Sequence, residues 1–265
     1  MEKYEGLRKY LNRFDSIAVA FSAGVDSTFL LKMCHDLMGD KCVAITAKSP
    51  GVPGVEIKEA EDYCKENGIR HIIFESDELS IPEYASNVDE RCYYCKKHIF
   101  GKIKELAAAE GIDTVIEGTN KDDMQDYRPG MRAVQELGIL SPLLAYGFTK
   151  EDIRNYSKML NVPTFDKNSF SCLATRVPFG EEITEDLLGR IEQAEEVLRS
   201  LGLKQYRVRV HNNELARIEV LPEDIEFTVR EVSRRVITEK YRDLGFKYIT
   251  IDLMGYRTGS LNPEV

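Results

Sequence analysis

The sequence predicts an α/β protein in which a doubly wound parallel sheet is followed by a small C-terminal α+β domain. In the first half of the chain, short apolar runs of strand length alternate with segments of helical spacing. Helices that connect successive strands in this way imply right-handed crossovers between parallel strands. The tail changes character, since two segments of alternating pattern flank a short polar turn there. These observations together give the fold class.

The elements of the first half follow in strict alternation. Continuous apolar runs are typical of parallel strands buried on both faces and predict the strands. Recurring apolar residues predict the helices, two of which end at Gly68 and Gly111. The expected order is a helix at 3–13, a strand at 16–21, a helix at 27–38, a strand at 42–46, a helix at 55–67, a strand at 70–74, a helix at 96–110 and a strand at 113–117.

The second half predicts one further helix and then a separate unit. Thr149 to Asp152 forms a capping pattern ahead of a helix that ends before Pro163. A loop rich in Ser, Pro and Gly follows at 163–180. The tail is expected to pack on its own antiparallel sheet, with a helix at 184–201, strands at 205–210 and 215–220, a helix at 222–244 and a strand at 247–253. The expected domains are therefore 1–180 and 181–265.

Composition narrows the classes of partner. The chain has 265 residues, a net charge of -9 and a pI near 5.2. Binding along a nucleic acid usually draws on a basic excess, so the acidic balance disfavours such a substrate, although a local basic patch stays open. No apolar run approaches the roughly 20 residues that span a bilayer, and the charged N-terminus lacks a signal-peptide core. We expect no membrane partner and a cytoplasmic location.

The first predicted strand leads through Ser22-Ala23-Gly24-Val25-Asp26-Ser27 into a helix. Gly24 and the small Ala23 let a ligand approach the backbone, and the N–H groups of the helix favour an anion. Ser22 and Ser27 offer hydroxyl donors, and Asp26 would hold a Mg²⁺ ion that bridges phosphates. An N-capping turn is the alternative interpretation. With alanine at position 23, the loop is expected to form only if φ is negative there.

Polar residues follow two other predicted strands at the same edge of the sheet. Thr46 ends the second strand, and Gly118, Thr119, Asn120 and Asp123 follow the fourth. Ligands of open parallel sheets bind beyond the carboxyl ends of the strands. We expect these residues to line the nucleotide site together with the loop at 22–27, and plain turn chemistry is the alternative.

The six cysteines fall into two groups. Three occur in predicted core segments, where cysteine packs as a small hydrophobe, namely Cys34, Cys42 and Cys64. Cys92 and Cys95 form a Cys-x-x-Cys at the start of a helix, which suits a redox couple, half of a zinc site completed by His98, or part of an iron–sulfur site. Cys172 lies in a polar loop beside Arg176, which favours the thiolate. Three thiolates would hold a 4Fe-4S cluster with one iron open.

Arginines in the tail suggest an anionic ligand. Arg207 and Arg209 alternate on one strand and therefore project from the same face, where bidentate contacts to phosphate are favourable. Arg257 and Ser260 form a second small polar cluster. The alternative is that these arginines are solvated or paired with the glutamates of the tail.

Residues 22–27 resemble the Ser-Gly-Gly-x-Asp-Ser signature of the PP-loop ATP pyrophosphatases, with Ala23 in place of the second glycine. That resemblance implies cleavage of ATP to AMP and pyrophosphate. Together with the segments at 91–96, 117–123 and 171–176, nearly the whole chain resembles the LarE family, the ATP-dependent sulfur-insertion enzymes of nickel-pincer nucleotide synthesis. The family implies that a carboxylate of pyridinium-3,5-biscarboxylic acid mononucleotide is adenylated and converted to a thiocarboxylate.

The family uses two sulfur sources. In one subset the cysteine matching Cys172 is sacrificed and becomes dehydroalanine. In the other, three cysteines hold a 4Fe-4S cluster that passes on a bound sulfide. Since Cys92, Cys95 and Cys172 are all present, this chain resembles the cluster type, which implies a sulfide donor as partner, and sacrifice of Cys172 is the alternative.

The resemblance also implies roles for individual residues. ATP and Mg²⁺ would bind at the loop, with Asp26 catalytic, and Glu195 or Glu196 would act near the reacting carboxylate. Residues near Cys172 would bind the substrate, namely Arg176, Arg207, Arg209, Arg257 and Ser260. The family's tendency to assemble implies a homo-oligomer. The rival functions are an ATP-dependent tRNA thiolase, an ATP-binding module with a redox-sensing Cys-x-x-Cys, and a structural zinc site at Cys92 and Cys95.

Overall fold

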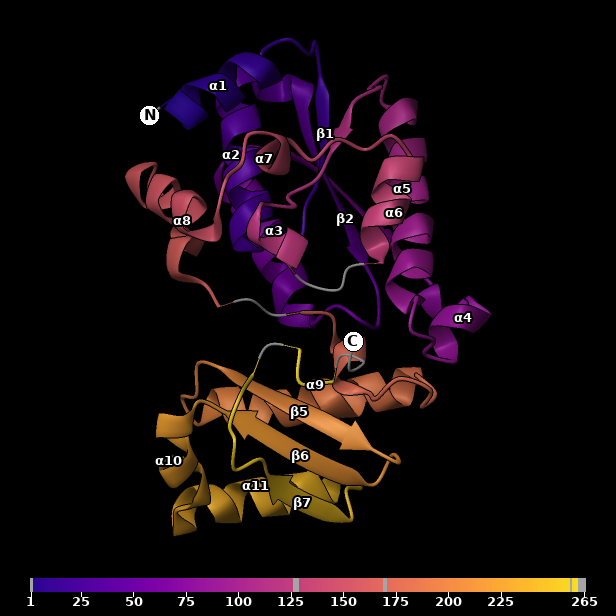
Figure 1. The fold of residues 1–265 in the computed structure, drawn as a ribbon, viewed down its shortest axis with the longest axis vertical. Helices are drawn as coiled ribbons and strands as arrows, with labels where there is room; N and C mark the ends of the chain where they lie inside the picture. The colour runs from indigo at the N-terminus through magenta and orange to yellow at the C-terminus, as the bar shows by residue number, and fades with distance from the viewer. Residues whose placement is uncertain (1, 126–128, 169–170, 258, 262–265) are drawn as a thin grey trace. The chain divides into compact units, whose positions relative to one another are not determined.

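The computed structural model describes residues 2–125, 129–168, 171–257 and 259–261, which divide into two compact units (Figure 1). The first comprises residues 1–78 and 90–170, and the second comprises 79–89 and 171–265. The boundary expected near residue 180 thus lies within the second unit. Asn87 Nδ2 donates to the carbonyl of Pro178 at 2.7 Å, and the Ile183 N–H donates to the carbonyl of Ala85 at 2.7 Å. These bonds bring residues 79–89 into the second unit.

A four-stranded parallel sheet forms the centre of the first unit, as predicted. Its strands are β1 (Ile17–Ala20), β2 (Cys42–Lys48), β3 (Arg70–Glu75) and β4 (Val115–Ile116). Their spatial order is β3-β2-β1-β4. The chain therefore moves outward from β1 to β3 and then returns to the other side of β1. This reversal places the loops that follow β1 and β4 next to each other, at the position where such sheets bind ligands.

Helices cover both faces of this sheet. Successive residues of a strand point to opposite faces, and apolar residues lie on both. Ile17 and Val19 face the core shared with α1, α2 and α3, whereas Ala18 and Val43 face the core of α5 and α6. The helices of this unit are α1 (Glu2–Leu11), α2 (Val25–Met38), α3 (Gly54–Glu66), α5 (Arg91–Ala109), α6 (Gly130–Glu136), α7 (Pro142–Ala145) and α8 (Lys150–Met159). No helix in the described part of the chain is long and apolar enough to cross a membrane.

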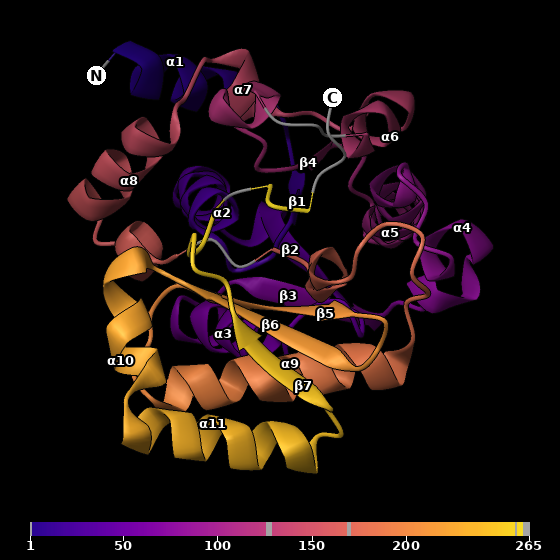
Figure 2. The same ribbon diagram turned by 60° about the horizontal axis from the view of Figure 1, so that its bottom comes forward.

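The second unit packs helices against a three-stranded sheet (Figure 2). Its elements are α4 (Pro82–Ala85), α9 (Glu185–Ser200), β5 (Tyr206–His211), β6 (Leu215–Val220), α10 (Ile225–Val229), α11 (Glu231–Asp243) and β7 (Tyr248–Ile251). Strands β5 and β6 are antiparallel, but β6 and β7 are parallel. The expectation of a wholly antiparallel sheet was wrong, because α10 and α11 form a crossover between β6 and β7.

Other boundaries differ locally from the expected ones. The helix expected at 222–244 is interrupted at Arg230, whose backbone is extended with ψ at 150°. Helix α5 begins at Arg91, so that Cys92 and Cys95 lie inside its first turns. Short 3-10 segments complete the fold, namely η1 (Gly39–Lys41), η2 (Glu78–Ser80), η3 (Asp122–Gln125), η4 (Pro163–Asp166), η5 (Leu173–Arg176) and η6 (Pro222–Asp224).

Candidate functional site

The loop between β1 and α2 is held by its own side chains and leaves the end of the helix open. Ser22 Oγ lies 3.1 Å from Ser27 Oγ, and Thr28 Oγ1 donates to the carbonyl of Gly24 at 2.7 Å. Gly24 occupies the N-cap position of the 14-residue helix α2 and supplies no side-chain cap. The first N–H groups of the helix and two hydroxyls therefore surround a position suited to an anion.

Ala23 departs from the expectation of negative φ. Its φ is 53°, in the left-handed region, so that expectation was wrong. The carbonyl of Ala23 accepts a hydrogen bond from Lys167 Nζ at 3.0 Å. A left-handed alanine costs roughly 1–2 kcal/mol, and the surrounding contacts must hold it there.

The loop after β4 lies directly against the start of α2. A Cβ atom added to Gly118 would lie 3.0 Å from the backbone nitrogen of Ser27, so any other residue would push the two backbones apart by a few tenths of an ångström. Buried Glu117 orients the next turn, because it accepts hydrogen bonds from Thr119 Oγ1 at 2.7 Å and from the Thr119 N–H at 3.1 Å. Asp123 Oδ2 accepts from the N–H of Asn120 at 3.0 Å. The residues expected to line a nucleotide site are thus brought together.

Asp26 is a largely buried carboxylate at the start of α2. Burial raises the pKa of its carboxyl, and the Lys150 ammonium, with which it forms an ion pair, acts in the opposite direction. Asp26 Oδ1 and Asn120 Nδ2 are both buried, and within the described chain neither has a hydrogen-bond partner. The amide of Asn120 also favours the ionised carboxylate, although the two side chains do not reach hydrogen-bonding geometry. A buried oxygen with open lone pairs fits Mg²⁺, which prefers oxygen ligands.

Thr46 anchors the end of β1. Its buried hydroxyl donates to the carbonyl of Phe21 at 2.7 Å and lies 2.8 Å from His71 Nε2. Burial lowers the pKa of His71, so a neutral ring is favoured there. Thr46 therefore supports the strand that leads into the loop, and its contact with a nucleotide stays a prediction.

The six cysteines are all free thiols. Cys34, Cys42 and Cys64 are buried in the core, as predicted. Cys92 and Cys95 are three residues apart on α5 and thus share one helix face, and both are partly exposed. His98 lies 3.3 Å from Asp77.

The three cysteines outside the core belong to different units. Cys92 and Cys95 belong to the first unit, and Cys172 is an exposed residue of the second. Over the described ranges, no group of three or more His, Cys, Asp or Glu side chains is gathered to hold a metal ion. Two accessible thiols on one helix turn and a third exposed thiol are nevertheless donors of the kind that such clusters use.

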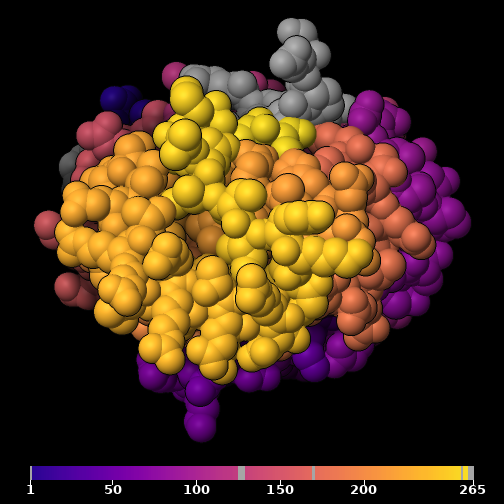
Figure 3. All heavy atoms as spheres, turned by 90° about the horizontal axis from the view of Figure 1, so that it is seen from below, coloured from indigo at the N-terminus to yellow at the C-terminus, as the bar shows by residue number. Residues whose placement is uncertain are grey.

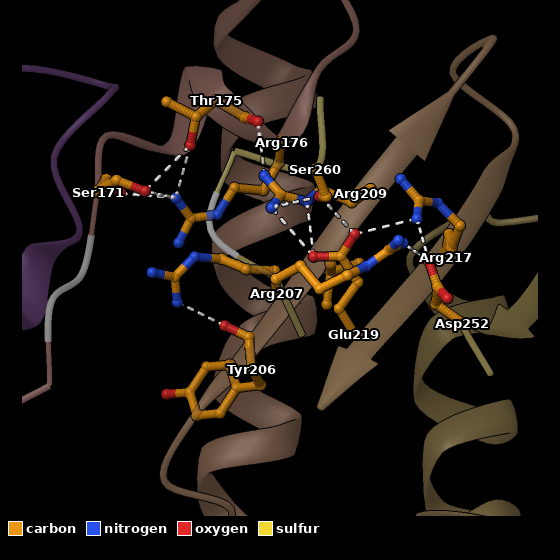
Figure 4. Close-up of polar contacts among 12 residues, drawn as sticks. Ser171, Thr175, Arg176, Tyr206, Arg207, Arg209, Arg217, Glu219, Asp252 and Ser260 are labelled. Atoms are coloured by element: carbon orange, nitrogen blue, oxygen red, sulfur yellow. Dashed lines mark hydrogen bonds and ion pairs between the residues drawn. The ribbon is translucent and has the colours of Figure 1, made fainter. Parts of the chain in front are cut away.

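Arg176 holds the loop that carries Cys172, and Figure 4 shows its contacts with Ser171 and Thr175. Its fully buried guanidinium forms two parallel bonds to Glu195, from Nε at 2.8 Å and from Nη2 at 3.0 Å. Its Nη1 donates to the carbonyl of Ser171 at 2.6 Å, to the carbonyl of Cys172 at 3.0 Å and to Thr175 Oγ1 at 3.0 Å. The thiol of Cys172 lies 4.0 Å from the hydroxyl of Tyr84. Arg176 therefore positions the backbone of the cysteine loop.

Two further arginines lie buried in the same network (Figure 4). Arg209 Nη2 donates to Ser260 Oγ at 3.0 Å, and Ser260 Oγ donates to Glu219 at 2.8 Å. Burial and the nearby charge of Arg176 lower the pKa of Arg207 to about 10. Arg209 is paired with Glu219 at 3.0 Å, as the alternative for the tail arginines predicted, so part of the charge of this network is already balanced. Its buried guanidinium groups are still donors of the kind that bind a phosphate or carboxylate.

Three other predicted site residues differ in how close they lie to this arginine network, namely Arg257, Glu195 and Glu196. Arg257 is half-exposed and reaches the edge of the network through Asp252, at 3.3 Å from Oδ2. Glu195 is buried, and its carboxylate accepts from the Val208 N–H at 3.0 Å as well as from Arg176. Glu196 is exposed and paired with Arg199 at 2.6 Å. The structure thus brings Glu195, but not Glu196, into the arginine network.

Sequence reasoning missed several residues that shape these sites. Lys150 and Lys167 both contact the loop at 22–27. Glu117 and Glu219 are buried carboxylates that organise their surroundings. Lys150 lies between Thr149 and Asp152, whose residue types predict a helix cap. Its own position along the chain gives no sign of a contact with Asp26.

Comparison with known proteins adds evidence of relationship, although no family model matches the chain. The chain is 42% identical over 260 residues to an uncharacterised protein of Synechocystis, covering 98% of this chain and 97% of that protein. It is 36% identical over 253 residues to pyridinium-3,5-bisthiocarboxylic acid mononucleotide synthase of Lactiplantibacillus plantarum, covering 95% and 91% of the two chains. Argininosuccinate synthase of Pyrococcus furiosus is 25% identical over 165 residues, which cover 57% of this chain and 40% of that enzyme. With the parallel sheet, these similarities indicate a PP-loop domain of an ATP-using enzyme.

The left-handed backbone of Ala23 predicts an unusual stability effect. Ala23→Gly is expected to raise the free energy of unfolding by about 1 kcal/mol, because glycine adopts positive φ without the steric penalty. Urea denaturation monitored by circular dichroism measures the change. Ala108→Gly, at an exposed position of helix α5, is the control and should lower stability by about 1 kcal/mol. Equal losses in the two variants would contradict this account of position 23.

Adjacent glutamates of α9 test the buried clamp. Glu195→Gln is expected to lower the free energy of unfolding by about 3–5 kcal/mol, because Arg176 would keep a buried charge without its counter-ion. Glu196→Gln should change it by less than about 0.5 kcal/mol, since that pair is exposed. Thermal and urea denaturation of the two variants give the comparison, and similar losses would show that the clamp does not stabilise the unit.

Proposed function

Because the chain belongs to the family of pyridinium-3,5-bisthiocarboxylic acid mononucleotide synthase, the LarE family, we propose that it is an ATP-dependent sulfurtransferase. Its substrate would be pyridinium-3,5-biscarboxylic acid mononucleotide, of which one carboxylate is adenylated and then converted to a thiocarboxylate. One observation carries the proposal, namely that the chain has both a phosphate loop without a side-chain cap and an exposed cysteine whose backbone is held by a buried arginine.

The first step is activation of a poor leaving group. A substrate carboxylate oxygen attacks the α-phosphorus of ATP, and the bond to the bridging oxygen breaks to release pyrophosphate. The N–H groups at the start of α2, with Ser22 and Ser27, would hold the phosphates. Asp26 would hold the Mg²⁺ ion, which supplies charge neutralisation when bound. Gly118, Thr119, Asn120 and Asp123 would line the nucleotide beside them, with Thr46 behind the loop.

The second step replaces AMP by sulfur. A sulfur nucleophile attacks the acyl carbon, and AMP leaves with the electron pair of the broken C–O bond. Arg207, Arg209 and Ser260 would bind the substrate phosphate, with Arg257 at the edge of that network. Arg176 would act through the cysteine loop, and Glu195 is the better placed of the two glutamates to influence the reacting carboxylate because it lies in the network.

Two sources of the sulfur atom are compatible with this reaction. Cys92, Cys95 and Cys172 would hold a 4Fe-4S cluster, which supplies a labile sulfide when loaded by a sulfide donor. Sacrifice of Cys172 is the alternative, supported by the exposure of its thiol and by the clamp on its loop. The free thiols and the use of ATP favour the cytoplasm as the compartment.

Assembly into a homo-oligomer would use the second unit, whose C-terminal helices and strands are coloured orange to yellow in Figure 3. Large apolar side chains are exposed there, including Val232, Leu253 and Met254. Burial of such side chains between copies of the chain would remove apolar surface from water. The net charge of -9 favours a small nucleotide over the tRNA of a thiolase as the acceptor.

Anaerobic turnover tests the proposed reaction. We expect AMP and pyrophosphate to form only when the pyridinium substrate is present, and chromatography with mass spectrometry should detect the thiocarboxylate product. No AMP with this substrate would contradict the proposal. Release of AMP with tRNA instead would favour a thiolase.

Iron, sulfide and intact-mass measurements on the same protein separate the sulfur sources. A brown protein that loses its iron in Cys92→Ala, Cys95→Ala and Cys172→Ala, but not in the buried control Cys64→Ala, supports the cluster. Loss of about 34 mass units after turnover, the elements of hydrogen sulfide, would indicate dehydroalanine at Cys172.

A further inference from the structure

We propose that Lys150 is an exchangeable cation of the phosphate loop, which neutralises Asp26 before nucleotide binds and transfers to the phosphates of ATP when Mg²⁺ arrives. This inference rests on the proposed function because it requires ATP at the loop. It assigns a positioning and charge-stabilising role to a residue of α8, outside the loop that forms the phosphate cradle.

The backbone of Lys150 is held close to the nucleotide-binding loops. Thr149 and Asp152 form a reciprocal capping box at the start of α8. The Lys150 N–H donates to Asp122 Oδ2 at 2.7 Å, and the Asp122 N–H donates to Asn120 Oδ1 at 2.9 Å. The base of this lysine is therefore tied to the loop after β4, which itself lies against the start of α2.

The tip of Lys150 is less restricted than its base. Its ammonium pairs with Asp26 Oδ2, and the side chain keeps 33% of its surface exposed. Four methylene groups separate the ammonium from the backbone, so the tip can move several ångströms while the helix stays fixed. Within the described chain, Asp26 provides the one ion pair that Lys150 makes.

Lys167 illustrates the difference between a structural and an exchangeable lysine. Its ammonium lies 2.5 Å from Glu59 and 3.8 Å from Glu56, and it donates to the carbonyl of Ala23 at 3.0 Å. Arg154 holds the backbone beside it through the carbonyl of Lys167 at 2.8 Å. These contacts leave Lys167 as a support for the loop, whereas Lys150 binds the carboxylate that a metal ion would use.

Electrostatics makes the exchange necessary. A divalent ion on Asp26 and an ammonium on the same carboxylate repel each other in a partly buried site. The MgATP complex brings the anion that Lys150 then needs, so charge stays balanced as the lysine leaves Asp26 for the phosphates. During adenylation, electrons of the breaking P–O bond move to the departing pyrophosphate, and Lys150 would stabilise that developing charge.

Lys150→Met, with Lys158→Met on an exposed position of the same helix as control, tests the exchange. Calorimetric titration with Mg²⁺ alone should give about tenfold tighter binding in Lys150→Met, since the competing ammonium is gone. Binding of the Mg²⁺ complex of α,β-methylene-ATP should weaken about tenfold, and AMP formation should slow about 10²–10³-fold. Lys158→Met should match the parent protein in all three measurements.

The opposed changes in the two affinities separate this role from simple loss of structure, which would weaken both. Lys150→Arg keeps the charge and should bind Mg²⁺ alone as the parent does. Equal Mg²⁺ affinity in Lys150→Met and the parent would overturn the exchange. Failure of the parent to form AMP with the pyridinium substrate would instead refute the proposed function, and the Mg²⁺ titration would still decide the role of Lys150.

Discussion

The close approach of the Gly118 backbone to the N-terminus of α2 is the constraint on which the first unit depends. It requires β4 to return beside β1, which the strand order β3-β2-β1-β4 provides. Glycine at position 118 favours it, because a Cβ atom there would lie 3.0 Å from the Ser27 nitrogen and would push the two backbones apart. This approach brings Asp26, Asn120 and Lys150 into one small region. There Asp26 pairs with Lys150, whereas Asp26 Oδ1 and Asn120 Nδ2 have no hydrogen-bond partner within the described residues.

The second unit uses buried charge in a related way. Arg176 and Glu195 form a desolvated pair whose net contribution to stability is small compared with the damage that follows when one member is removed. The pair fixes the position of the Arg176 guanidinium, which donates hydrogen bonds to the carbonyls of Ser171 and Cys172. Arg207 and Arg209 add buried positive charge nearby, and Glu219 balances that of Arg209 at 3.0 Å.

Much of the fold could be predicted because burial leaves a regular trace in a sequence. Apolar runs in the sequence predict β1 and β2, and the residue types from Thr149 to Asp152 predict the capping box. The direction of β7 was not visible, because alternation specifies a strand but not its neighbour. The interruption at Arg230 was missed because helical spacing continues on both sides of an extended residue, and the positive φ of Ala23 was missed because alanine ordinarily has negative φ.

By itself, the sequence determined the α/β class, the position of the phosphate loop and the residues able to act as thiolate or guanidinium groups, because these depend on local pattern and chemical identity. Only the tertiary structure decided which groups meet. The pairing of Lys150 with Asp26 spans 124 positions, and that of Arg209 with Ser260 spans 51. Such contacts leave no periodic signal, because side-chain partners are chosen by packing of whole elements. The partner of each of these charges is therefore set by folding, not by its place in the chain.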